Sequence, residues 1–98
     1  MDAIPSFGVL TGWDFFMEER IHAVTVTIYN RDLAYLKVSE LLHQYARFIN
    51  LRVGYPVPSR NIAIIFLILT MTNDALGALT GKLGQISSVK VKANTLSV

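Results

Sequence analysis

The sequence predicts an α+β domain in which two helices cover one face of a four-stranded antiparallel sheet. Apolar residues recur at the two-residue period of a strand in four segments and at the period of a helix in two. These segments follow one another as strand, helix, strand, strand, helix, strand. The chain has 98 residues, enough for one domain. We therefore place a single domain at residues 17–98, preceded by an N-terminal extension of residues 1–16.

The first strand spans residues 20–29, where β-branched residues alternate with threonines. Either Asn30 or Asp32 caps the helix that follows, because both side chains accept hydrogen bonds from the first turn of a helix. This helix continues to Tyr45 or Arg47. Its apolar face has the spacing of one side of a helix and consists of Ala34, Val38, Leu41, Leu42 and Tyr45.

The second strand spans residues 49–55 and ends where Pro56 and Pro58 remove backbone donors from the ladder. The third strand, residues 61–70, is the most apolar segment of the chain, and it is apolar on both sides. One side consists of Ile62, Ile64, Phe66 and Ile68, and the other of Ala63, Ile65, Leu67 and Leu69.

Asn73 and Asp74 are the expected cap of the second helix, and Gly84 occupies the position of a glycine that ends a helix. The last strand spans residues 89–94, where small or branched residues alternate with Lys90, Lys92 and Asn94. The inward face of the second helix consists of Leu76, Leu79, Thr80 and Leu83.

This order of elements is the split βαβ pattern of a ferredoxin-like βαββαβ sandwich. Two right-handed crossovers place the strands in the order 4-1-3-2 and both helices on one face. The hydropathy pattern supports this order, because the two edge strands are apolar on one side and the third strand is apolar on both.

The face of the sheet away from the helices predicts self-association. Burying one large aliphatic side chain contributes roughly 1.5–3 kcal/mol. Exposing three of them would therefore forgo about 5–9 kcal/mol, comparable to the stability of a small domain. We expect a homodimer or homotetramer. The predicted interface consists of Ala63, Ile65, Leu67 and Leu69, with Gly77 and Gly81 of the second helix. The two glycines have the alternative of packing against their own sheet.

The N-terminal extension has two interpretations. It contains four aromatic residues, which could dock on the domain, covering the open face in place of a second copy, or on a neighbouring subunit. Alternatively, it is a flexible tail, or translation naturally begins at Met17. The aromatic residues are Phe7, Trp13, Phe15 and Phe16.

Composition argues against nucleic acid and membrane as direct partners. The nine basic residues are scattered and the net charge is only +2, so DNA binding is not expected without a partner. The longest apolar run, residues 62–69, is shorter than the about 18 residues that a membrane span needs. We expect a cytoplasmic protein. Lys90 and Lys92 share one side of an edge strand, where they either discourage aggregation or contact an anionic partner.

No residue set proposes a reaction, a metal site or a cofactor. The chain has no cysteine, and its two histidines, His22 and His43, lack further ligands at a suitable spacing. We expect both at the surface or at an interface. The acidic residues are few and form no acid–base pair. The sequence therefore predicts a protein that is not an enzyme.

Four stretches together resemble a known family. They are residues 51–56, 61–67, 73–86 and 89–92, and the third, which includes Gly81-Lys82-Leu83-Gly84, is the most specific. The chain resembles the regulators of the iron-only ([FeFe]) hydrogenase system from about Met17 to its C-terminus. The resemblance implies an ACT-like regulatory fold, a link to hydrogenase maturation, and similarity to the sensing domain of nickel-responsive repressors. This chain lacks the histidines and cysteine of their metal site, and residues 1–16 are too short for their DNA-binding unit.

By the same resemblance, a small-molecule effector would bind near the junction of the first strand and first helix. The candidates are Asn30, Arg31 and Asp32, with Arg52 as an anion contact. Capping and solvated charge are the alternative roles of these four residues. The predicted function is an oligomeric regulatory protein that acts by sensing a small ligand or by protein interaction. The alternative is a transcriptional regulator that binds DNA directly.

Overall fold

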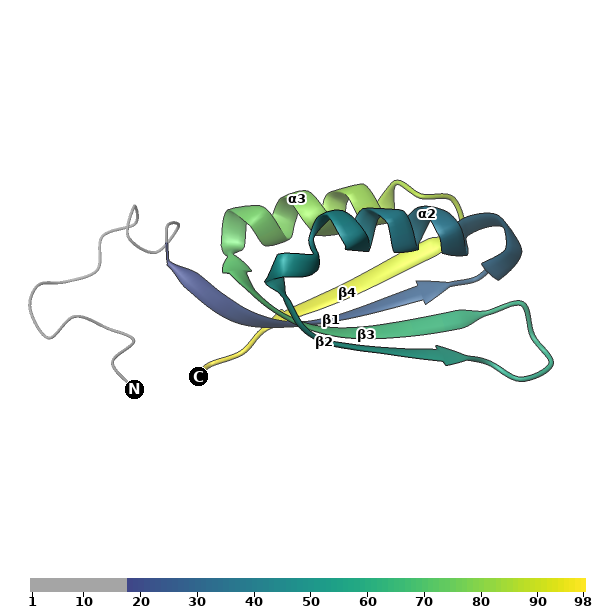
Figure 1. The fold of residues 1–98 in the computed structure, drawn as a ribbon, viewed down its shortest axis with the longest axis horizontal. Coiled ribbons are helices and arrows are strands. Elements are labelled where there is room, and N and C mark those ends of the chain that lie inside the picture. Colours follow the sequence, from purple (N-terminus) through teal and green to yellow (C-terminus); the bar gives the residue numbers. More distant parts are fainter. Residues whose placement is uncertain (1–17) are drawn as a thin grey trace, which may run out of the picture.

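A computed structural model describes residues 18–98 as two layers, helices on a sheet (Figure 1). The predicted order of strands and helices is confirmed, while the N-terminal extension lies outside the described residues. The elements are β1 (Glu19–Ile28), α2 (Arg31–Gln44), the 3-10 helix η1 (Ala46–Phe48), β2 (Ile49–Pro56), β3 (Ala63–Thr72), α3 (Asn73–Gly84) and β4 (Val89–Thr95).

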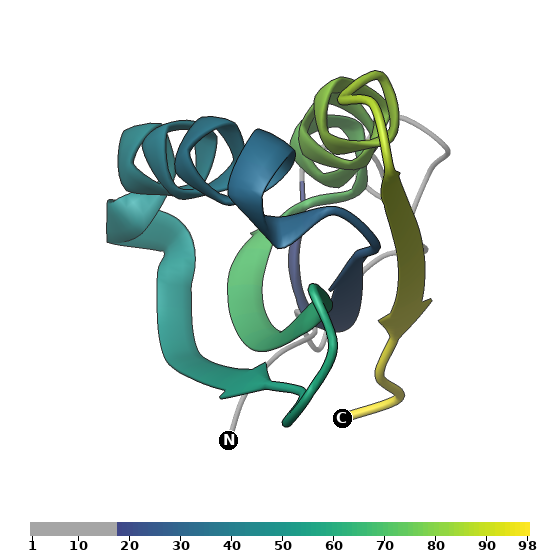
Figure 2. The same cartoon turned by 90° about the vertical axis from the view of Figure 1, so that its right-hand side faces the viewer.

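The four strands form one antiparallel sheet in the order β2-β3-β1-β4, which confirms the predicted 4-1-3-2 arrangement. Both helices lie on the same face. Figure 2 shows α2 above the β2 side of the sheet and α3 above the β4 side. The ferredoxin-like fold is therefore present in full within residues 18–98.

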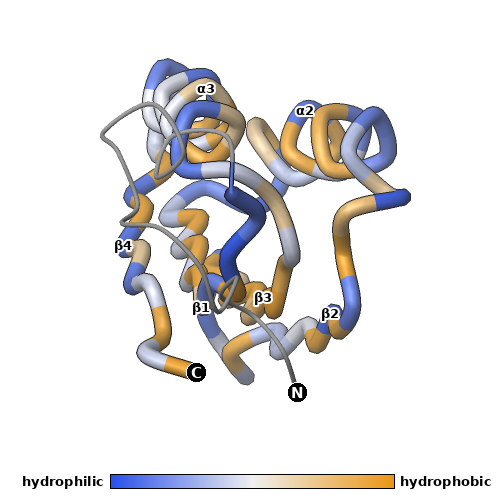
Figure 3. The backbone as a smooth tube through the Cα atoms, turned by 90° about the vertical axis from the view of Figure 1, so that its left-hand side faces the viewer, coloured by the Kyte–Doolittle hydropathy of each residue, from blue (hydrophilic) through white to orange (hydrophobic). Residues whose placement is uncertain are grey.

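The core lies between the helices and the sheet. The helices contribute side chains with no exposure, such as Val38 and Leu42 from α2 and Leu79 from α3. Beneath them, Val24 and Val26 of β1 are equally buried. Figure 3 shows hydrophobic positions recurring along both helices and along the strands below them. Burial of these periodic apolar residues holds the two layers together.

The predicted assignment of the two sides of β3 is wrong. Ala63, Ile65, Leu67 and Leu69 face the helices and are 0–3% exposed, so they do not lie on the open side. The pairing with β1 decides this, because Leu67 lies opposite Val24 and Ile65 opposite Val26, and paired residues share a face. Both sides of β3 are apolar, so the hydropathy of this strand alone carried no information about which side is covered.

The predicted caps of α3 are also wrong. Thr72 is the N-cap, and its hydroxyl accepts a hydrogen bond from the backbone N–H of Ala75 at 3.1 Å. Gly84 is still helical, and Gln85 ends the helix in a right-handed conformation (φ −80°, ψ −14°). Threonine and asparagine both occur as N-cap residues, so residue type alone did not distinguish Thr72 from Asn73 as the cap of α3.

Within residues 18–98, no helix is long and apolar enough to cross a membrane.

Candidate functional site

The junction between β1 and α2 is fastened to the β2–β3 turn by two asparagines. Asn30, the N-cap of α2, accepts hydrogen bonds from the backbone N–H of Leu33 at 3.2 Å and from Nδ2 of Asn61 at 2.8 Å. Asn61 in turn accepts one from the backbone N–H of Asp32 at 3.2 Å. Its carbonyl also accepts from the N–H of Arg31 at 2.9 Å. We call this arrangement the Asn30–Asn61 clasp.

A tight turn presents Asn61 to the clasp. The N–H of Val57 donates to the carbonyl of Ile62 at 3.0 Å, and Ser59 adopts a left-handed conformation with φ 63°. A residue with a side chain is uncommon in that conformation, which costs conformational energy. The turn is therefore held by its neighbours, including the clasp.

An open pocket of about 370 Å³ lies beside the clasp, and we call it the corner pocket. Two guanidinium groups and one carboxylate line it, so its net charge is positive. Its position at the first turn of α2 adds the partial positive charge of a helix N-terminus. The residues that line it are Arg31, Asp32, Ser59, Arg60 and Asn61.

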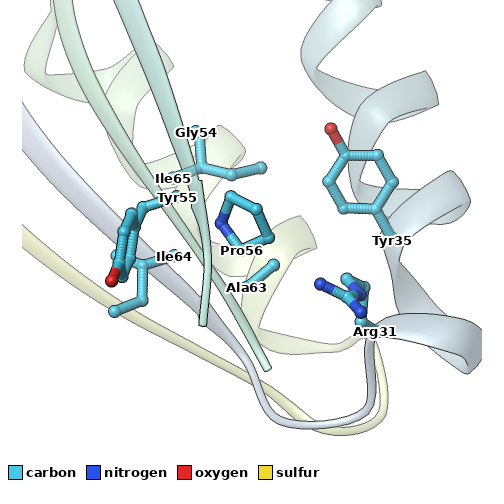
Figure 4. A pocket seen from close by; sticks show the side chains of 8 residues that line it. All are labelled: Arg31, Tyr35, Gly54, Tyr55, Pro56, Ala63, Ile64 and Ile65. Carbon is cyan, nitrogen blue, oxygen red and sulfur yellow. The ribbon is translucent and has the colours of Figure 1, made fainter. Parts of the chain in front are cut away.

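A second cavity, of about 210 Å³, lies between the first half of α2 and the adjoining ends of β2 and β3 (Figure 4). We call it the slot. Arg31 borders both the slot and the corner pocket. The slot is lined by Arg31, Tyr35, Gly54, Tyr55, Pro56, Ala63, Ile64 and Ile65.

The structure brings three of the four predicted ligand-binding residues together. Asn30, Arg31 and Asp32 meet at the clasp, with Arg31 and Asp32 on the corner pocket. Arg52 lies elsewhere on the helix-facing side of β2, where its Nη2 donates to the hydroxyl of Ser39 at 3.3 Å. Arg52 is therefore not part of this pocket.

Sequence reasoning missed the contributions of Arg60, Asn61, Tyr35 and Gly54. A glycine within a strand often marks a close approach or an empty space, so Gly54 carried a usable signal. Arg60 and Asn61 of the β2–β3 turn carried no such signal, because only the folded chain brings them close to Asn30.

Gly77 and Gly81 are exposed on α3, and an added Cβ at either position would meet nothing within 4 Å. The alternative that they pack against their own sheet is therefore wrong. Their predicted role in an interface stays a prediction.

His22 is fully buried, which corrects its expected position at a surface or an interface. Its Nε2 donates to the carbonyl of Met71 at 2.9 Å, and its Nδ1 lies 2.9 Å from the hydroxyl of Thr95. His43 is exposed near the end of α2. Residues 18–98 contain no group of three or more His, Asp or Glu side chains that could hold a metal ion.

The sheet face opposite the helices carries a continuous apolar strip across β2 and β3. Val53 lies opposite Phe66, and Tyr55 opposite Ile64. Phe66 is 38% exposed and Val53 is 50% exposed. We call this surface the open face, and it consists of Leu51, Val53, Tyr55, Ile64, Phe66 and Ile68.

Comparisons with known proteins identify relatives of the whole domain. The family model described as "TM1266-like: Iron-only hydrogenase system regulator, putative" matches residues 20–93. The structure of the uncharacterized protein TM1266 from Thermotoga maritima is 52% identical, with a TM-score of 0.78, and the match covers 82% of this chain and 100% of that chain.

A more distant structure shares the fold alone. The ACT domain of GTP pyrophosphokinase from Chlorobium tepidum is 15% identical, with a TM-score of 0.63, and the match covers 82% of this chain and 89% of that chain. The fold is therefore ACT-like. No curated protein matches the chain.

Proposed function

Because the chain belongs to the TM1266-like family of iron-only hydrogenase system regulators, we propose that it regulates this system without catalysis. In this proposal it self-associates and senses a small anionic ligand. The observation that carries the proposal is the corner pocket, where Arg31 and Arg60 flank a clasp that joins two elements of the fold. The ACT-like fold supports it by analogy only.

The charges at the corner pocket favour an anion with two acceptor groups. One guanidinium group can donate two parallel hydrogen bonds to two oxygens of a carboxylate or a phosphate. Arg31 belongs to α2 and Arg60 to the β2–β3 turn, so one anion that contacts both side chains would connect the two elements. The carboxylate of Asp32 also lines the pocket and would repel the part of an anion that lies next to it. Anions that keep their negative charge near the two arginines would therefore bind more tightly than anions that are charged all round.

Ligand binding at the corner pocket would change the conformation of the open face through strands β2 and β3. The β2–β3 turn joins the two strands that carry the apolar strip. A ligand that binds one arrangement of the turn more tightly shifts the population toward it. If that arrangement also associates more tightly, ligand binding and self-association are coupled, and each strengthens the other.

Thermal denaturation of the full chain tests the sensing step. We expect phosphate or a small dicarboxylate, compared at equal ionic strength, to raise the melting temperature. A ligand at 100 times its dissociation constant adds about 2.7 kcal/mol of stability, or roughly 10–20 °C for a domain of this size. Arg60→Gln should remove the effect. Arg47→Gln is the matched control, because it removes the same charge from η1, away from the pocket.

Equal shifts in both variants would show a general salt effect and contradict sensing at the corner pocket. The absence of any shift across nucleotides, amino acids, phosphate and dicarboxylates would contradict it as well.

A second copy of the chain is the proposed cover of the open face. The matched relative consists entirely of this domain, since the match covers 100% of that chain. The open face carries six apolar residues side by side, and contiguous exposed apolar surface of this kind marks interaction sites. Packing two such sheets face to face would bury the open face of both copies.

The native mass in solution tests self-association. We expect light scattering to give twice the mass of the single 10.9 kDa chain, or a larger multiple. Phe66→Glu should yield single chains, because it places a charge in the centre of the open face. Leu36→Glu is the matched control: Leu36 is 70% exposed on α2, in the opposite layer. A single-chain mass for the unmodified protein would end the proposal of self-association.

Direct DNA binding is the alternative mechanism. Arg47 precedes β2 and Arg60 follows it, so these two basic residues lie at opposite ends of that strand. Lys90 and Lys92 lie on β4, at the other edge of the sheet. One chain therefore gathers no basic stripe from these four residues. Salt-dependent binding to a hydrogenase promoter fragment in a gel shift would favour the alternative.

A further inference from the structure

We propose that the slot between α2 and β2 binds a molecule with one planar apolar ring and one carboxylate, with the ring beneath α2 and the acid on Arg31. This inference goes beyond the proposed sensing function, because it concerns a second cavity and a different class of ligand. The slot itself is a different cavity from the corner pocket, and the two share only Arg31.

The slot exists because small residues stand where larger side chains would fill the layer. Gly54 lies opposite Ile65 of β3, so a side chain at this position would point toward the helices. An added Cβ there would meet nothing within 4 Å. Ala63 contributes only a methyl group, and Pro56 lies opposite it. A glycine in a strand interior weakens the strand, so the empty space has a cost in stability that a branched residue would avoid.

The walls of the slot are suited to a flat ring. The aromatic ring of Tyr35 forms the α2 side, and Ile65 and Pro56 belong to the sheet side (Figure 4). Aromatic rings stack on or pack edge-to-face against such surfaces. A planar apolar group would therefore displace water from both walls at once.

Arg31 supplies the only formal charge among the residues that line the slot. Its guanidinium makes no hydrogen bond or ion pair with another group of residues 18–98. Figure 4 shows the side chain on the α2 side below Tyr35, across from Pro56 and Ala63. A carboxylate beside apolar walls would be attracted more strongly than in open water. No acidic residue lines the slot, so an ammonium group would find no carboxylate there.

The slot, which is open to solvent on one side, holds about one ring. An engineered apolar cavity of about 150 Å³ holds a benzene molecule. The slot, at about 210 Å³, has room for such a ring and a small acidic substituent. Most of a nucleotide would lie outside the slot in solvent, and a free aliphatic amino acid would leave the ring position empty. Aromatic and heteroaromatic monocarboxylates are therefore the ligand class.

Titration of the isotopically labelled full chain with benzoate, followed by amide NMR shifts, tests the proposal. We expect saturable shifts at Gly54, Ala63 and Ile65, with a dissociation constant of roughly 0.1–1 mM, the range of a well-seated ligand this small. Benzyl alcohol probes the ring alone, and acetate probes the acid alone. Both should bind more weakly than benzoate.

Two variants separate the ring from the acid. Arg31→Gln should weaken benzoate binding at least tenfold and leave benzyl alcohol unchanged. Gly54→Leu should abolish binding of both by filling the slot. Gly54→Ala is the milder variant if Gly54→Leu fails to fold, because its Cβ has free space; it should weaken both ligands. Arg47→Gln should change neither.

Benzoate binding that survives Gly54→Leu in a folded protein would overturn the proposal. Loss of benzoate binding in Arg60→Gln would overturn it too, because Arg60 lines only the corner pocket. The result is independent of the thermal test of the corner pocket. Sensing at the corner pocket fails if phosphate and dicarboxylates give no Arg60-dependent shift, whether or not benzoate occupies the slot.

Discussion

The two sides of β3 differ little in composition and greatly in burial. On β3, Leu67 faces the helices with no exposure, while its neighbour Phe66 on the open face is 38% exposed. On β1, Val26 is fully buried and the threonines on either side of it are not. A hydrophobic side chain in a strand therefore predicts that its side of the sheet is buried against another element or another chain. The element that packs on that surface decides which side forms the core.

The largest difference between the faces should appear on truncating a buried leucine. Leu67→Ala should lower the free energy of unfolding by about 2–5 kcal/mol, because it removes packed methyl groups and leaves a cavity. Urea denaturation at equal protein concentration measures the loss. A loss below that of a surface substitution would contradict the assignment of Leu67 to the helix side.

Substitution of the buried His22 tests whether hydrogen bonds of polar groups on the helix-facing side also contribute to stability. His22→Leu should cost about 1–3 kcal/mol, because the Met71 carbonyl and the Thr95 hydroxyl lose their partner. His43→Leu is the matched control, since His43 is exposed. Equal urea midpoints for the two variants would show that the His22 hydrogen bonds add nothing to stability.

The start of α3 tests how the helix layer is held in place. Thr72→Ala should cost about 1 kcal/mol, because the hydroxyl caps the N–H of Ala75. Asn73→Ala should be neutral or slightly stabilising, since the buried Oδ1 of Asn73 has no hydrogen-bond partner among the described residues. Thermal melts of the two variants measure the difference. The opposite order would restore Asn73 as the cap.

The smallest effect should come from the open face. Val53→Thr should change the free energy of unfolding of the single chain by about 0.5 kcal/mol or less, because Val53 is already 50% exposed. In the assembled protein the loss should be larger and depend on protein concentration. Unfolding curves at two concentrations separate these cases, and a loss independent of concentration would contradict a shared open face.

Much of the fold could be predicted, because its signals are local. The alternation of valine and threonine on β1 and the helical spacing of Ala34, Val38 and Leu42 identify elements without knowledge of their neighbours. The order of these elements then limits the topology to few arrangements. The candidate site was predicted only where it is local too, in Asn30, Arg31 and Asp32.

The amino-acid sequence by itself determined the elements, their order and the apolar character of both sides of β3, because each follows from the period of a short segment. Only the tertiary structure decided which side of β3 the helices cover, that Asn61 meets Asn30, and that Gly54 leaves a cavity beneath α2. These are contacts between segments distant in sequence. Their geometry depends on how the layers pack, and no local period encodes it.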